Sequence, residues 1–135
     1  MSEQETERGD RINIDESVMP IYKDLTDSKD KEESPFNTYR DLFLAAACVG
    51  YEIGRRESLP NNKKTQIRHS VFGEHGFAVM QALAIAETED VGVLGDQGKV
   101  LTIAEEYAHA GIKELEIRLI EERGRPLWNL IDLVA

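Results

Sequence analysis

The amino-acid sequence predicts an all-α fold, a compact bundle of four or five helices around a buried central helix, with short strand or hairpin elements possible. Residues 39–54 are apolar on almost every side, as in a helix that lies inside a core. Residues 77–88 and 102–123 repeat apolar side chains at helical spacing. A chain of 135 residues can bury one core without disulfides or metals. We therefore expect residues 11–135 to form a single helical domain.

The N-terminal part of the chain predicts little regular structure. Residues 1–10 are charged and lack periodicity, which indicates a disordered acidic leader. Residues 11–15 alternate apolar and polar side chains, as a short strand or an extended lead-in does. Asp15 then caps a helix that runs to about Thr26 and has an apolar stripe, made of Val18, Ile21, Tyr22 and Leu25. Residues 26–35 form a charged linker.

The central helix begins after Asn37 or Thr38 as its N-cap and ends at Gly54. Gly50 and Gly54 leave a notch where the backbone of another helix could approach closely. The helix at 77–88 has little polar surface, so we expect it to be the packing partner of the central helix.

The remaining segments are less regular. Residues 57–66 read as a polar loop, residues 67–72 as either a short strand or a single helical turn, and residues 89–101 as an irregular connection or a short hairpin. Thr102 and Glu105 have the spacing of a capping box and predict the start of a helix that runs to Arg123, before Gly124. Pro126 suits the first turn of a last helix, residues 127–134, whose Trp128, Ile131 and Leu133 need a surface to cover.

Composition limits the cellular setting. The only cysteine, Cys48, excludes an intramolecular disulfide, and we interpret it as a small buried apolar residue. No apolar run reaches the roughly 20 residues that a membrane span requires, and the N-terminus is acidic where an export signal would be basic. We expect a cytoplasmic protein with no membrane partner.

Net charge is −10 and unevenly distributed. Acids outnumber bases by 11 to 5 in residues 1–35 and by 12 to 5 in residues 70–135, whereas residues 36–69 carry 3 acids and 6 bases. An acidic chain repels nucleic acid, so any contact with DNA or RNA would use the middle segment. Its basic group is the candidate binding site for a partner protein or nucleic acid and consists of Arg55, Arg56, Lys63, Lys64 and Arg68. These cations suit phosphates or an acidic protein surface, and the alternative is that they neutralise a helix end and solubilise a loop.

Signals for catalysis are weak. Glu106 and His109 have the Glu-x-x-His spacing of di-iron bundles, but a second copy and two further glutamates are missing. Glu74 and His75 lie between glycines and read as a polar turn. We predict no catalytic residue, metal ligand or cofactor.

Two segments carry a family resemblance, residues 36–56 (FNTYRDLFLAAACVGYEIGRR) and residues 103–112 (IAEEYAHAGI). Together they resemble a small accessory family of bacterial Dnd systems, which act in DNA phosphorothioation, the replacement of a backbone oxygen by sulfur, and in the restriction that depends on it. The resemblance covers most of residues 36–123 and implies a defence context without an active site.

The resemblance and the residues together lead to one main hypothesis, a non-enzymatic accessory protein that binds a larger protein of a Dnd locus, or DNA, through the basic group. The alternative is a DNA-binding transcriptional regulator of the same locus. A small metal-dependent enzyme based on Glu106 and His109 is the least favoured hypothesis, and homo-oligomerisation stays open.

Overall fold

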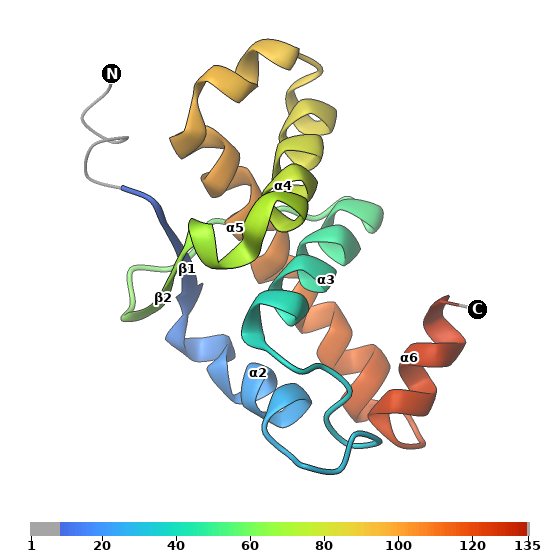
Figure 1. Cartoon of the computed structure of the whole chain (residues 1–135). Helices are drawn as coiled ribbons and strands as arrows, with labels where there is room; N and C mark the ends of the chain where they lie inside the picture. The colour runs from blue at the N-terminus through green and yellow to red at the C-terminus, as the bar shows by residue number, and fades with distance from the viewer. Residues whose placement is uncertain (1–8, 135) are drawn as a thin grey trace.

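The computed structural model describes residues 9–134 and confirms a mostly helical fold with one small sheet (Figure 1). The regular elements in chain order are β1 (Arg11–Asp15), α2 (Met19–Thr26), α3 (Tyr39–Glu52), β2 (Lys64–Arg68), α4 (Gly73–Thr88), α5 (Gln97–Leu115) and α6 (Pro126–Val134). Single-turn 3-10 helices η1 (Glu16–Val18), η2 (His69–Phe72) and η3 (Val91–Gly95) precede α2, α4 and α5, and the π-helical η4 (Glu116–Glu121) continues α5. No helix in this described part is long and apolar enough to span a bilayer.

The predicted acidic leader lies outside the described residues except for Gly9 and Asp10, which form a turn before β1. Asp15 ends β1 and caps η1 by accepting a hydrogen bond from the backbone nitrogen of Ser17 at 3.1 Å. The predicted strand at 11–15 and the helix ending at Thr26 are therefore confirmed.

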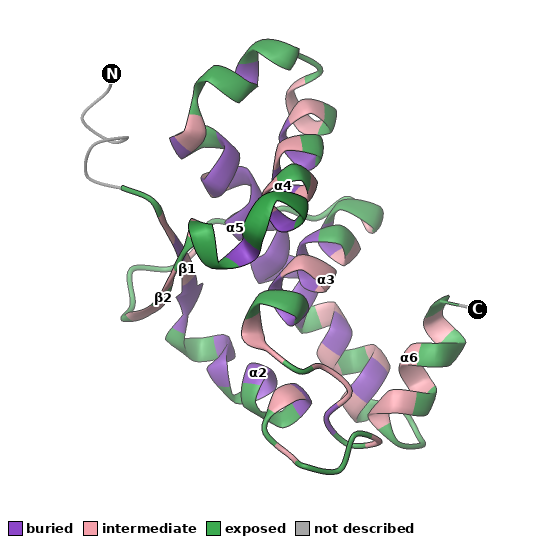
Figure 2. Cartoon of the chain, viewed as in Figure 1, coloured by how far each residue is buried: buried purple, intermediate pink, exposed green. Residues whose placement is uncertain are grey.

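The centre of the fold is the crossing of α3 and α5 (Figure 1), and α5 is the most thoroughly buried helix (Figure 2). The prediction that residues 77–88 form the packing partner of α3 is wrong, because α3 packs mainly against α5. The helix that contains residues 77–88 is α4, which begins at Gly73 and also packs mainly against α5. Helix α4 is the more apolar of the two, whereas α5 carries several charged residues, so hydrophobicity favoured the wrong partner.

Two glycines allow the close approach of α3 and α5. A Cβ atom at Gly50 would overlap the carbonyl oxygen of Tyr107 and lie 2.8 Å from its carbonyl carbon. A Cβ atom at Gly111 would overlap the carbonyl oxygen of Ala46 and lie 2.7 Å from the backbone nitrogen of Gly50. The predicted notch at Gly50 is therefore confirmed, but its partner glycine is Gly111. Gly54 follows the end of α3 with a φ of 69°, and a Cβ atom at this position would have no neighbour within 4 Å. Gly54 is therefore not part of this close approach.

The predicted capping box at Thr102 and Glu105 is wrong. Helix α5 begins at Gln97, and the carboxylate of its N-cap Asp96 accepts a hydrogen bond from the backbone nitrogen of Lys99 at 3.1 Å. The Thr102 hydroxyl instead donates within the helix to the carbonyl of Gly98 at 2.9 Å. Thr-x-x-Glu spacing also occurs inside helices, and Gly98 in the first turn concealed the true start.

The sheet consists of β1 and β2 in antiparallel register, from Arg11 opposite Arg68 to Asp15 opposite Lys64. Ile12 and Ile14 are buried on its core face. Residues 57–66 are therefore not all loop, since β2 begins at Lys64. Residues 67–72 are divided between strand and 3-10 turn, so each of the two alternatives describes one part of that segment.

The charged linker is fastened to the start of α6. Arg125 forms ion pairs with Asp30 and with Glu33, the latter at 3.4 Å, and the Leu127 amide donates to the carbonyl of Glu32 at 2.9 Å. Helix α6 begins at Pro126, one residue before the predicted start, and ends at Val134 as predicted. It has no buried residue (Figure 2), and its Trp128 remains 54 % exposed.

Cys48 corrects another prediction, because it lies on the exposed side of α3 rather than in the core. Partial desolvation raises the pKa of its thiol, so the neutral form dominates near pH 7. The buried side of α3 is made of Leu42, Phe43, Ala46, Ala47 and Gly50.

Candidate partner-binding surface

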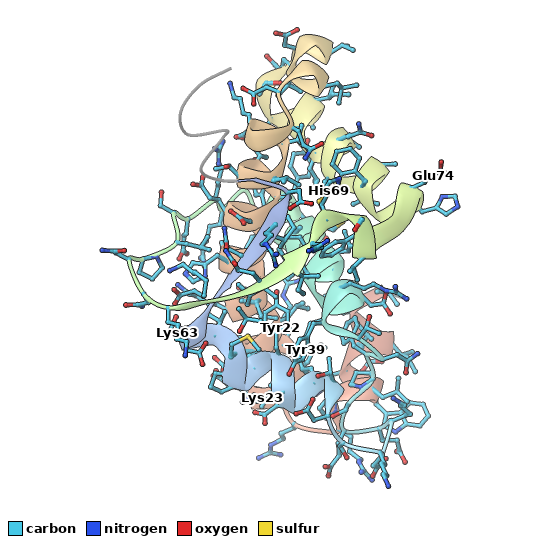
Figure 3. The ribbon with its side chains drawn as sticks, turned by 60° about the vertical axis from the view of Figure 1, so that its left-hand side comes forward. Tyr22, Lys23, Tyr39, Lys63, His69 and Glu74 are labelled. Atoms are coloured by element: carbon cyan, nitrogen blue, oxygen red, sulfur yellow. The ribbon has the colours of Figure 1, made fainter. Side chains whose placement is uncertain are left out.

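The five residues of the predicted basic group follow one path, from the end of α3 through the loop at 53–63 into β2. Figure 3 shows Lys63 and His69 at the two ends of β2. The structure divides the group into two sets according to what the side chains contact. Arg56 and Lys64 bind carboxylates of this chain, whereas Arg55, Lys63 and Arg68 are exposed and form no such ion pair within residues 9–134.

Arg56 fastens the end of α3 to two other helices. Its Nε lies 2.7 Å from Oε1 of Glu106 on α5, and its Nη1 lies 3.6 Å from Oε1 of Glu87 on α4. The hydroxyl of Tyr107 donates to the other oxygen of Glu87 at 2.7 Å. Burial and the adjacent Glu87 carboxylate raise the pKa of Tyr107 to about 12, so this hydroxyl remains a donor at neutral pH. The positive charge of Arg56 is therefore largely compensated within the fold.

Lys64 has an equally internal role. Its Nζ lies 3.0 Å from Oδ1 of Asp15, and it donates to the carbonyl of Pro60 at 2.6 Å and to that of Asn62. The Asp15 side chain is fully buried, and its other oxygen accepts from the Ser17 hydroxyl. Burial alone would raise the pKa of Asp15, but hydrogen bonds from Ser17, Lys64 and Asn62 outweigh it and hold the pKa well below its usual range.

The three other cations point their charge at solvent. Within residues 9–134, Arg55, Lys63 and Arg68 make no ion pair at 4.0 Å or less. Arg68 lies opposite Arg11 across the sheet. We call Arg55, Lys63 and Arg68 the exposed basic trio. Lys63 precedes β2 and Arg68 ends it, so the length of the strand separates these two members of the trio.

The Glu106 and His109 pair does not form a metal centre with its neighbours. Glu106 binds Arg56, while His109 is buried and lines a small crevice with Asn13, Asp15 and Glu105. Burial is the largest effect on His109 and lowers the pKa of its imidazole. In the part of the chain that the structure describes, no group of three or more His, Cys, Asp or Glu side chains could hold a metal ion.

The comparison with protein families decides the broader identity. A family model described as DNA sulphur modification system-associated protein 4 matches residues 11–134, from β1 to the end of α6. The chain belongs to this family. Membership associates it with a DNA sulphur modification system, as the resemblance at residues 36–56 and 103–112 implied. No curated protein and no solved structure gives a significant match.

The sequence did not predict that two carboxylates of this protein, those of Asp15 and Glu105, are buried. Asp15 was interpreted only as a helix cap, although it also forms the ion pair with Lys64. Glu105 is 5 % exposed, and its carboxylate accepts a hydrogen bond from the backbone nitrogen of Asn13 in β1. The sequence signal for Glu105 was mixed, because Leu101 and Ala108 on its helical face are apolar whereas Thr102 and His109 are polar. No comparable pattern identifies Asp15.

Proposed function

We propose that this chain is a non-enzymatic accessory protein of a bacterial DNA sulphur modification system, acting in the cytoplasm by binding a larger protein of that system. The observation that carries the proposal is the exposed basic trio on a chain with a net charge of −10. Family membership supplies the system, and the trio supplies a surface that differs in charge from the rest of the molecule.

The charge arrangement favours a protein over DNA as the partner. Affinity for duplex DNA grows with the number of phosphates that cations neutralise. Arg56 and Lys64 are already paired with carboxylates, which leaves three cations of the original five. The acidic remainder of the chain would repel a long polyanion but would face a local acidic patch of a protein at only a few points.

The proposal predicts that the chain co-purifies with one or more proteins encoded in its own locus. Reversing the trio (Arg55→Glu, Lys63→Glu and Arg68→Glu) is expected to weaken that complex about tenfold or more, because attraction becomes repulsion. The fold should persist, since Glu at position 68 would face Arg11 across the sheet. Affinity is measured by biolayer interferometry with the partner immobilised.

A charge-matched control reverses three exposed cations elsewhere, Lys31, Lys99 and Arg123, each to Glu. We expect its affinity to stay within about twofold of wild type, since these residues lie away from the trio. Equal weakening by both triple variants would show a net-charge effect and contradict a local site. A wild-type chain that binds no protein of its locus would refute the proposed function.

The rival hypothesis, a DNA-binding regulator, makes a separate prediction. If the trio contacts DNA, the logarithm of affinity for duplex DNA should fall with the logarithm of salt concentration with a slope of about −3. Fluorescence anisotropy with a labelled duplex from the locus promoter measures this slope. Tight, salt-sensitive DNA binding together with no protein complex would favour the regulator.

A further inference from the structure

Within residues 9–134, no strand pairs with the outer edge of β2, the edge that faces away from β1. Two backbone hydrogen bonds lie just beyond the two ends of the β1–β2 pairing. The Glu16 amide donates to the Lys63 carbonyl (3.0 Å), and the His69 amide donates to the Asp10 carbonyl (2.8 Å). In an antiparallel pair, hydrogen-bonded and non-hydrogen-bonded residue pairs alternate along the strands. Between these two bonds, every second residue of β2 therefore forms backbone hydrogen bonds with β1. The remaining residues direct their backbone N–H and C=O groups away from β1, and these are Lys64, Gln66 and Arg68.

The other strand of the sheet, β1, lies against α5. On β1, Asn13 directs its backbone N–H away from β2, and the carboxylate of Glu105 on α5 accepts a hydrogen bond from it. Within the described chain, β2 packs mainly against β1, and no α-helix makes more than weak contact with it. An open row of backbone donors and acceptors is a template for another strand.

An apolar hollow adjoins this open edge. It has a volume of about 250 Å³ and is lined by Thr38, Tyr39, Arg40, Ile67 and Val71. Tyr39 is seen in Figure 3 on the side of β2 away from β1. Val71 is 47 % exposed there, and the Arg40 guanidinium donates to its carbonyl at 3.1 Å. The hollow offers a place for one apolar side chain next to the strand.

The alternation of side chains in a sheet predicts which residue types an added strand would carry at each position. A residue placed opposite Ile67 would project its side chain to the same face as Ile67, toward the hollow. Its two neighbours along the added strand would project to the other face, beside Gln66 and Arg68. The exposed guanidinium of Arg68 lies on that side, so a carboxylate opposite it would form a favourable cross-strand pair.

We propose that the outer edge of β2 binds an extended segment of a partner protein, in which an apolar residue is flanked by acidic residues. The segment adds as a third strand, with main-chain hydrogen bonds to Gln66 and Arg68 and its apolar side chain in the hollow. This inference rests on the proposed function, since it specifies how the locus partner is recognised.

Charge argues against a second copy of this chain as the occupant. Antiparallel pairing of β2 with itself, centred on Gln66, would place Lys64 opposite the second copy's Arg68. Parallel pairing in register would place each cation beside its own equivalent. Like charges directly opposite one another destabilise a sheet, whereas an acidic segment is stabilised by Arg40, Lys63 and Arg68.

The test compares Gln66→Pro with Gln66→Ala in the complex of the full chain with its locus partner. Proline removes only the outward N–H, which is compatible with an edge strand, and both variants lose the side-chain hydrogen bond from Gln66 to Asn13. We expect Gln66→Pro to weaken binding about tenfold, and Gln66→Ala to stay within about twofold of wild type. Hydrogen exchange at residues 64–68 should slow in the wild-type complex.

A second variant keeps the proposal testable if proline disturbs folding. Val71→Asp places a charge in the hollow at an exposed position, and it is expected to weaken the complex about tenfold without unfolding the chain. Arrayed 12-residue peptides tiled across the bound partner should show binding to segments in which an apolar residue is flanked by acids.

The outcomes separate this inference from the proposed function. Binding that is equal for wild type, Gln66→Pro and Val71→Asp, with unchanged exchange at residues 64–68, would overturn strand addition while the accessory role stands. Binding of duplex DNA at this edge in place of a protein would also overturn it. If the wild-type chain binds no protein of its locus, the proposed function fails and the inference fails with it.

Discussion

Replacing Gly111 with alanine is expected to lower the free energy of unfolding by about 3 kcal/mol or more, even though alanine is intrinsically the better helix former by about 1 kcal/mol. The added methyl group would overlap the carbonyl oxygen of Ala46 and lie 2.7 Å from the Gly50 nitrogen. Both obstacles are backbone atoms of α3, so rotation of a side chain cannot relieve the overlap. The two central helices must separate, which loosens packing along the whole crossing.

Thermal unfolding followed by circular dichroism measures this effect, with an expected decrease in Tm of roughly 10 °C. Gly95→Ala is the matched control, because a Cβ atom there meets nothing within 4 Å and the residue has no positive φ. We expect the control to change the free energy of unfolding by less than about 0.5 kcal/mol. A Gly111→Ala protein as stable as the control would show that the α3 and α5 backbones are farther apart than described.

Local signals in the sequence predicted individual elements well. Alternation at residues 11–15, Thr38 before an apolar run and Pro126 before another each place an element boundary correctly. These signals depend on a few adjacent residues, whose backbone preferences act whatever the rest of the chain does. The start of α5 was missed because Asp96, Gln97 and Gly98 give a weaker local signal than Thr102 and Glu105.

Contacts between distant segments were not predictable in the same way. Gly50 indicated that a backbone approaches α3, but several apolar helices could supply it, and only the folded chain selects Gly111. The local excess of charge identified the basic group. It did not predict which of its residues form ion pairs within the chain. The partners of Arg56 and Lys64 are Glu106 and Asp15, about 50 residues away in the sequence. Pairing over such separations depends on tertiary structure, which charge counts do not contain.

Replacing Asp15 with asparagine is expected to cost about 3 kcal/mol of stability at pH 7. Asparagine has nearly the same shape and remains a good helix cap, so the change removes mainly the charge that compensates Lys64. Removing the ammonium as well, in Asp15→Asn with Lys64→Met, should recover part of the loss. Asp41→Asn is the control at an exposed aspartate of α3, with an expected change below about 0.5 kcal/mol, and urea unfolding measures all of these variants.

The pH dependence of the stability difference between wild type and Asp15→Asn tests whether the buried charge of Asp15 causes that difference. The pKa of Asp15 is lower in the folded chain than its usual unfolded value of about 3.9, so the folded state binds fewer protons in the window between the two. The contribution of Asp15 is therefore complete above about pH 5 and decreases as the pH falls below about 4. The stability difference between wild type and Asp15→Asn should stay constant above pH 7 and narrow between pH 4 and 3. Between these windows the neighbouring His109 adds a separate change, because the charge of Asp15 raises the pKa of its imidazole. Other carboxylates, including Glu57 with its lowered pKa, titrate in both proteins and cancel in the difference. A difference that stays unchanged down to pH 3 would mean that Asp15 stabilises the fold through shape and hydrogen bonding rather than through its charge.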